Sequence, residues 1–244
     1  MPGEDTRTRA RALWEGLAGT PVSFPRAGGI RVVVSPASGL CPAGWTGVVV
    51  LGGSALVTAP DGGTATSVRD ALRGLPADVD AIRGALPATG VLGPAALAYL
   101  SPDRFRPAAA PPTVERLPGD HPALRALEGA AGDDDAGEAA LEDITSPAFV
   151  VRERGEVVAA AGYRAWPHRT AHLSVLTAPG ARGRGLARRT ASAAVAHALA
   201  GGLLPQWRAR PEASRRVAAA LGFEELGAQL SVELDPGSPT SGWA

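Results

Sequence analysis

The order of hydrophobic and polar positions in the second half of the chain predicts a hairpin, a third strand and a helix. Residues 147–166 alternate as two strands about a turn at Arg154 and Gly155, and residues 170–179 form a further apolar run. A helix is predicted from Leu186, because small apolar side chains recur at helical spacing. These inward positions are Ala187, Ala191, Ala194, Val195 and Ala198.

The remaining residues of this half predict a second helix and a closing strand. Pro211 stands where a helix can begin, and Gly222 follows the last apolar position of the stripe. Residues 228–234 alternate as a final strand. This order of elements predicts a mixed α/β domain with a sheet flanked by helices: a hairpin, a strand, a loop, a helix, a strand, a helix and a final strand.

The first half predicts strands followed by a helix, without recognisable chemistry. β-Branched runs at 29–36 and 44–60 are bounded by Gly and Pro, and the second is typical of a hairpin around Gly52 and Gly53. Residues 64–75 have apolar positions at helical spacing. We therefore expect a strand-and-helix domain here, whose role the sequence does not indicate.

A proline-rich break, PAAAPP at 107–112, can continue neither a helix nor a central strand. We place a domain boundary there, which gives an N-terminal α/β domain at 1–112 and a second domain at 113–235. The tail at 236–244 is rich in Gly, Pro and Ser and is expected to be disordered.

Composition narrows the class of protein. The 244 residues are 45% hydrophobic and 20% charged, and 24 basic residues balance 24 acidic ones, so we expect no general polyanion or nucleic-acid binder. A single cysteine, Cys41, permits no internal disulfide and no zinc site built on cysteine pairs. The sequence has no long apolar stretch and no export signal, which favours a cytoplasmic protein without a membrane partner.

Charge is nevertheless polarised within the second half. Residues 119–143 contain eight acids and one arginine, and residues 182–216 contain eight arginines and one acid. The acidic stretch could face a cationic substrate, or the two stretches could simply be solvated faces of opposite sign. Nucleic-acid binding through the basic stretch rests on charge alone, because Trp207 is its one aromatic residue.

The loop between the third strand and the first helix has the composition of an anion site. A strand that feeds a Gly-rich turn into a helix exposes unpaired backbone N–H groups at the positive end of the helix dipole. Gly183 and Gly185 permit close approach of a ligand, and Arg182, Arg184, Arg188 and Arg189 add charge. These features predict a pyrophosphate ligand, and the alternative is an arginine-rich surface turn.

Two common phosphate motifs do not fit this loop. The dinucleotide fingerprint needs a small residue where Arg188 stands, and no acid occurs in 200–211, where the ribose partner would lie. A Walker loop requires a lysine, and the sequence contains none.

The run Arg182-Gly183-Arg184-Gly185-Leu186-Ala187 resembles the Arg/Gln-x-x-Gly-x-Gly/Ala motif of the GNAT superfamily of acyl-CoA N-acyltransferases. Residues 213–227 resemble the closing helix and strand of that family, with its Leu-Gly-Phe signature, and residues 202–207 resemble a Gly-Leu-x-Pro-x-Trp strand of one bacterial branch. The resemblance covers about residues 113–235 and implies a GNAT-like central mixed sheet flanked by helices.

The resemblance implies transfer of an acetyl group from acetyl-CoA, without a metal, to a primary amine of a small molecule or a peptide by direct attack. The backbone of the loop would hold the coenzyme A pyrophosphate, and the third strand would pair with the pantetheine arm and polarise the thioester carbonyl. The expected cofactor-binding residues are Val175, Leu176, Thr177, Arg182, Gly183, Arg184, Gly185, Leu186, Ala187, Arg188 and Ser214.

Catalytic candidates follow from the place where many members hold a proton-accepting group. His172 shares a strand face with Ser174 and Leu176 near that place, although a histidine there could equally be structural. Glu142 in the acidic stretch is the second candidate, followed by Glu138.

Two departures from the family keep another function open. Ala218 stands where the family often has a tyrosine, and Pro211 stands where it often has an asparagine near the start of that helix. The alternative to an enzyme is a non-catalytic acyl-CoA-binding sensor.

Overall fold

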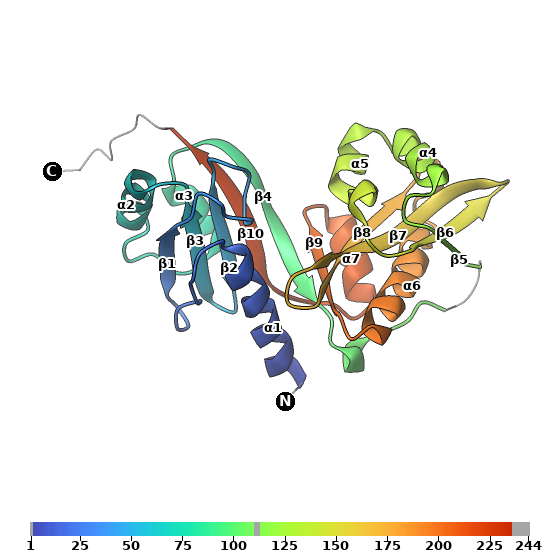
Figure 1. Ribbon diagram of the computed structural model, residues 1–244, viewed down its shortest axis with the longest axis horizontal. Helices are drawn as coiled ribbons and strands as arrows, with labels where there is room; N and C mark the ends of the chain where they lie inside the picture. The colour runs from blue at the N-terminus through green and yellow to red at the C-terminus, as the bar shows by residue number, and fades with distance from the viewer. Residues whose placement is uncertain (1, 110–112, 236–244) are drawn as a thin grey trace. The chain divides into compact units, whose positions relative to one another are not determined.

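The computed structural model describes residues 2–109 and 113–235, and its contacts divide the chain into two compact units (Figure 1). One unit comprises Gly3–Leu97 with the chain from Glu225 onward, and the other comprises Ala98–Glu224. This division differs from the predicted domains, because the closing strand pairs within the first unit rather than the second. The predicted boundary after residue 112 and the predicted disordered tail at 236–244 fall at residues outside the described part of the chain.

The first unit contains a mixed sheet in the order β1-β3-β2-β10-β4, in which β1 and β3 are parallel and β2 is antiparallel to both β3 and β10. Its elements are α1 (Pro2–Leu17), β1 (Ile30–Val34), β2 (Thr46–Leu51), β3 (Ser54–Ala59), α2 (Gly62–Ala71), α3 (Val79–Ala85), β4 (Ala88–Tyr99) and β10 (Glu224–Leu234).

The hairpin predicted around Gly52 and Gly53 is confirmed. Leu51 faces Ser54 across the turn, and both glycines have positive φ, 56° and 73°, as a two-residue turn of type I′ requires. Helix α2 begins where Asp61 accepts a hydrogen bond from the backbone of Thr64. The predicted helix at 64–75 is thus present but shifted toward the N-terminus.

Helix α1 and strand β4 were not expected from the sequence. Helix α1 places Leu13 and Trp14 fully inside the unit, although its many arginines mask this apolar stripe. Strand β4 contains Gly and Pro and lacks clear alternation, so packing within the unit rather than local pattern determines it.

The second unit contains the strand order β9-β8-β7-β6-β5, antiparallel from β5 to β8 and parallel between β8 and β9. Its elements are η1 (Pro102–Arg104), β5 (Glu115–Leu117), α4 (Pro122–Ala131), α5 (Asp133–Ala139), η2 (Leu141–Asp143), β6 (Ala148–Glu153), β7 (Glu156–Trp166), β8 (Thr170–Thr177), η3 (Pro179–Ala181), α6 (Leu186–Ala200), β9 (Leu204–Ala209) and α7 (Glu212–Ala220).

Helices cover both faces of this second sheet, which confirms the predicted architecture (Figure 1). Alternate side chains of β8 separate the two faces, because Ala171 and Leu173 pack in the cluster with α6 and α7 whereas Leu176 packs in the cluster with α4 and α5. Burial of both faces explains why these strands are predominantly apolar. The predicted turn at Arg154 and Gly155 is confirmed, again with two positive φ angles.

The described helices include none that is both long and apolar enough to cross a membrane.

Candidate functional site

A cavity opens where β8 and β9 separate. The two strands pair over only three residues each, Thr170–His172 with Leu204–Gln206. Beyond this point lies a cavity of about 550 Å³, within the usual range for small-molecule sites. Leu173 and Leu176 of β8 both line it, although their side chains belong to opposite faces of the sheet. The cavity therefore passes through the sheet, with α7 and the start of α6 on one side and α5 on the other.

The predicted glycine loop forms one wall of this cavity. Gly183 and Gly185 line it in left-handed conformations, with φ of 76° and 74°, and a Cβ on either would meet open space. Gly185 is the N-cap of α6 and provides no side-chain cap. The first backbone N–H groups of α6 therefore lack the usual capping acceptor at the positive end of the helix. Of the predicted inward stripe, Ala187 lines the cavity, whereas Ala191 is buried in the core.

Two buried polar atoms beside the cavity have no hydrogen-bond partner among the described residues. They are Oγ1 of Thr177, at the end of β8, and Nε of Arg188, in the first turn of α6. Because buried polar groups in folded proteins are almost always paired, these two atoms can form hydrogen bonds with a polar group inside the cavity. On the α7 side, Ser214 lines the cavity and accepts a hydrogen bond of 2.9 Å from the Trp207 indole.

The structure brings ten of the eleven predicted cofactor-binding residues to this cavity. They are Val175, Leu176, Thr177, Arg182, Gly183, Gly185, Leu186, Ala187, Arg188 and Ser214. Arg184 does not line the cavity, because its guanidinium forms a two-pronged ion pair with Glu153 of β6, at 2.5 and 2.9 Å. This hydrogen-bonded pair lowers the pKa of Glu153 and raises the pKa of Arg184.

Helix α5 carries two carboxylates to the cavity, and each binds an arginine. Asp135 forms an ion pair of 2.5 Å with Arg182 of the glycine loop, whose Nε also donates to the carbonyl of Thr177. Glu138 is bound by Arg210, which follows β9. The hydrogen bond from Arg210 to Glu138 raises the pKa of the Arg210 guanidinium. The third catalytic candidate thus lies at the cavity.

His172 lies outside the residues that line the cavity. Its ring stacks on Trp166, with ring centres 4.1 Å apart and planes 8° apart, and Nδ1 lies 2.5 Å from Oε1 of Gln206. Burial lowers the pKa of His172 to about 4, and the charge of Arg208 lowers it as well. The imidazole is therefore neutral at physiological pH and a weak proton acceptor.

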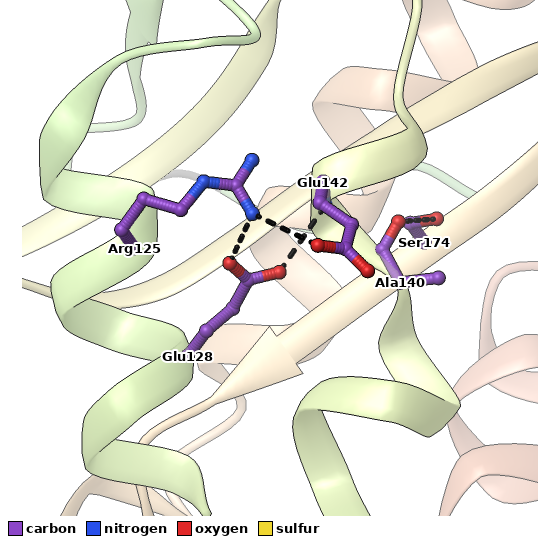
Figure 2. Close-up of polar contacts among 5 residues, drawn as sticks. All are labelled: Arg125, Glu128, Ala140, Glu142 and Ser174. Atoms are coloured by element: carbon purple, nitrogen blue, oxygen red, sulfur yellow. Dashed lines mark hydrogen bonds and ion pairs between the residues drawn. The ribbon is translucent and has the colours of Figure 1, made fainter. Parts of the chain in front are cut away.

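Glu142 also lies away from the cavity. Figure 2 shows its side chain next to Arg125 of α4, in an ion pair of 3.6 Å, while the Glu142 backbone N–H donates to the carboxylate of Glu128. The Glu142 side chain is 71% exposed. Its neighbour Ala140 has a left-handed conformation, with φ of 46°, and accepts a hydrogen bond from Ser174 of β8. This turn separates Glu142 from Glu138.

The departures at α7 have simple structural descriptions. Ala218 is buried among core side chains, 2% exposed, and Pro211 is the N-cap of α7 and lines the cavity. Sequence reasoning missed Arg208 and Asp135, which also line the cavity. Arg208 lies one residue beyond the strand predicted at 202–207, and in β9 it shares a face with Gln206, so the predicted strand ended just before it. In the described part of the chain, no group of three or more His, Cys, Asp or Glu side chains could hold a metal ion.

Comparison with known proteins identifies the fold of this region. Residues 146–228 match the family model of the GNAT acetyltransferases. No curated protein matches the sequence.

Solved structures of the same superfamily are similar to the chain. An acetyltransferase assigned to the GNAT family from Novosphingobium aromaticivorans is 28% identical, with a TM-score of 0.45, over 60% of this chain and 66% of that one. A GCN5-related N-acetyltransferase from Kribbella flavida is 21% identical, with a TM-score of 0.48, over 68% and 65%. A GCN5-related N-acetyltransferase-like protein from Streptococcus suis is 17% identical, with a TM-score of 0.48, over 95% and 99%.

The chain thus spans about two thirds of the length of the Novosphingobium and Kribbella proteins. The match to the family model agrees with the order of strand, glycine loop and helix around the cavity. Acyl transfer is the general class of reaction that this match supports, and residues 146–228 have the fold of the GNAT superfamily.

Proposed function

We propose that the protein is an acetyl-CoA-dependent N-acetyltransferase that acts on a primary amine of a small molecule or a peptide by direct attack. The observation that carries this proposal is the cavity that passes through the sheet between β8 and β9. Such a passage allows a cofactor to enter from the side of α6 and α7 and an amine from the side of α5. The reacting groups would meet between the strands, shielded from bulk water.

The residues of the glycine loop fit the diphosphate of coenzyme A. In our proposal the N–H groups from 183 to 188 and the guanidinium groups of Arg182 and Arg188 bind its oxygens. The unpartnered Nε of Arg188 and the open space in front of Gly183 and Gly185 support this assignment. Strand β8 would hold the pantetheine arm, and Thr177 would donate its unpartnered hydroxyl.

Acetyl-CoA supplies an activated acetyl group, and the protein supplies orientation and a proton acceptor. Backbone N–H groups of β8 near Val175 would stabilise negative charge on the carbonyl oxygen. For the proton of the attacking amine we propose Glu138, acting through water, because it lines the cavity on the α5 side. His172 and Glu142 are less suitable, because neither lines the cavity and the pKa of His172 is about 4.

Two measurements test the proposal. Purified protein should bind acetyl-CoA in calorimetry with micromolar affinity, and it should release free thiol from acetyl-CoA in the presence of some amine of a broad library. Absence of binding would overturn the assignment of the cavity. Glu138→Gln should lower kcat about 100-fold or more with little change in acetyl-CoA affinity. The matched control Glu142→Gln should retain activity, and the reverse result would assign the role to Glu142.

A second candidate function is a non-catalytic acyl-CoA sensor. The buried Ala218 favours this function, because many members of the resembled family have a tyrosine at this position and Ala218 has no hydroxyl. A sensor would bind acetyl-CoA without releasing thiol with any amine, so the thiol assay separates the two functions. A thiolate is a tolerable leaving group that solvent can protonate, which is why we place the enzyme first.

A further inference from the structure

The first unit has a cavity of its own beside strand β1. Its volume is about 440 Å³, and it lies between β1 and the end of helix α2. The residues that line it include Ile30, Arg31 and Val32 of β1 and Arg69, Leu72 and Arg73 at the end of α2. All of them belong to the first unit, so an inference drawn from this edge cavity does not depend on the proposed acetyl transfer.

Strand β1 has one side of its backbone directed away from the sheet. It stands at the end of the strand order, next to β3 (Figure 1). Gly29 and Ser35, which flank the strand, both bond to β3 through their backbones. Alternation between these two residues directs the N–H and C=O groups of residues 30, 32 and 34 outward. Among the described residues, Arg69 alone bonds to this outer edge, because its guanidinium donates to the carbonyl of Val32 at 3.3 Å.

This outer edge is suited to accept a further strand. Its sequence, IRVVV, is mostly β-branched, and the side chain of Val34 is 40% exposed. An extended peptide added here would form main-chain hydrogen bonds with the outward N–H and C=O groups. Its side chains on one face would lie beside Ile30 and Val32, which pack in the cluster with α2.

The charges around the edge cavity select the kind of strand. Among the described residues, no carboxylate forms an ion pair with Arg31 or Arg69, whereas Arg73 pairs with Asp70 at 2.6 Å. A second copy of the chain that paired β1 with β1 would bring two sets of these arginines together, which is unfavourable. A segment with carboxylates would instead form ion pairs with them.

We propose that the outer edge of β1 binds an extended acidic segment of a partner protein as an added strand. Successive side chains of a strand point to opposite faces. One acidic side chain would therefore meet Arg69 and Arg73 on the α2 side, and its neighbour would meet Arg31 on the other face. A pair of adjacent acidic residues within a β-branched segment is the sequence that fits this edge.

The test begins with a synthetic peptide. A fluorescent peptide of Val and Thr with two adjacent Glu residues at its centre is titrated with the protein, and binding is followed by fluorescence anisotropy. Replacement of both Glu residues by Gln should weaken binding about 2- to 30-fold, the range for two exposed ion pairs. Replacement of the flanking Val residues by Pro keeps the charge but removes N–H donors, and it should weaken binding at least as much. Failure of the Glu peptide to bind, or equal binding of the Gln peptide, would overturn the proposal.

Variants of the protein assign the binding to the arginines. Arg31→Gln and Arg69→Gln should each weaken binding of the Glu peptide about 1.4- to 5-fold. Arg31→Glu combined with Arg69→Glu should reverse the preference, so that a peptide with two Lys residues binds more tightly than the Glu peptide. Arg83→Gln is the matched control, because it removes an exposed charge of the same unit at a residue that does not line the edge cavity. An equal loss in Arg83→Gln would indicate general attraction and contradict the assignment.

Amide hydrogen exchange, followed by NMR, tests whether the peptide adds as a strand. At nine-tenths saturation, exchange at Ile30, Val32 and Val34 should slow about tenfold, because only the free protein exchanges there. Arg31 and Val33, whose N–H groups already face β3, should change less. Binding without this alternation would mean contact through charge alone and would overturn strand addition. Slowing at the same residues that grows with protein concentration, without peptide, would identify a second copy as the occupant and would also overturn the proposal.

Discussion

Asp135 occupies a position that the proposed cofactor needs. Its carboxylate lies 2.5 Å from the guanidinium of Arg182, the first residue of the glycine loop, and both side chains line the cavity. A diphosphate bound to the loop would have to share Arg182 with Asp135, or displace Asp135 from Arg182. We therefore predict that Asp135→Asn tightens the binding of acetyl-CoA. This direction is the opposite of the usual one, because removing a charged side chain that lines a binding site usually weakens ligand binding.

The size of the gain follows from the exposure of the pair. Arg182 and Asp135 are 49% and 47% exposed, so the ion pair belongs to the class worth about 0.2–1 kcal/mol. If the cofactor gains what the pair loses, Kd falls about 1.4- to 5-fold, since 1.4 kcal/mol corresponds to tenfold. Salt screens exposed charges, with a Debye length of about 10 Å at 0.1 M, so the gain should shrink at high ionic strength.

Calorimetric titration with acetyl-CoA at low and high salt measures this gain. Asp134→Asn is the matched control, because it removes the same charge from the same helix at a residue that does not line the cavity. An equal gain in both variants would indicate general repulsion rather than competition for Arg182. Weaker binding in Asp135→Asn would refute the reasoning, because it would mean that Asp135 helps to form the site.

Three further predictions concern the loop, His172 and the end of α7. Gly185→Ala should lower the free energy of unfolding of the ligand-free protein by about 1–2 kcal/mol, because φ is 74° there. The same variant should weaken acetyl-CoA binding at least about tenfold, because its Cβ would enter the open space in front of the loop. Thermal unfolding and calorimetry measure the two effects, with Gly180→Ala as the control. Because the folded pKa of His172, about 4, lies below the unfolded value of 6.5, its stabilising contribution is complete above pH 6.5 and is lost as pH falls toward 4. In urea unfolding, the free energy of unfolding of the wild type should fall from pH 7.5 to pH 5 by about 1–2 kcal/mol more than that of His172→Asn. An equal fall in both proteins would contradict the lowered pKa of His172. Gly222→Ala should destabilise the protein by about 2–4 kcal/mol in urea unfolding, because φ is 97° and a Cβ would overlap the carbonyl oxygen of Arg104; wild-type stability would show that the chain can shift there.

The sequence predicts best where one local rule determines the structure. The turns at Gly52–Gly53 and Arg154–Gly155 follow from turn chemistry, and helix α6 follows from a stripe of small apolar side chains. The partner of β10 is not a local property. Its register with β2, in which Gly227 faces Leu51, joins residues far apart in the chain, so the sequence pattern alone assigned this strand to the other domain.

The wall of the cavity that the glycine loop forms was predictable for a similar reason. The contacts of a glycine loop are made mainly by its own backbone, and its conformation depends on residues within the loop. Arg184 shows the limit, because its side chain leaves the loop to bind Glu153 on β6. Whether an arginine binds a ligand or a neighbouring carboxylate depends on strand placement, which the spacing within the loop does not encode.

The choice among the catalytic candidates depends on a turn at Ala140 that the sequence does not predict. Ala140 adopts a left-handed conformation, which costs a residue with a Cβ about 1–2 kcal/mol, and glycine would be the usual sign of such a turn. The carbonyl of Ala140 accepts a hydrogen bond from Ser174, so contact with β8 helps to hold the strained turn in place. Because α5 ends there, Glu138 faces the cavity while Glu142 pairs with Arg125 (Figure 2). A continuous helix would have placed these two glutamates on one face, four residues apart, and both would have been candidates. In our proposal the strained turn therefore favours Glu138 over Glu142 as the proton acceptor, since it directs Glu142 away from the cavity.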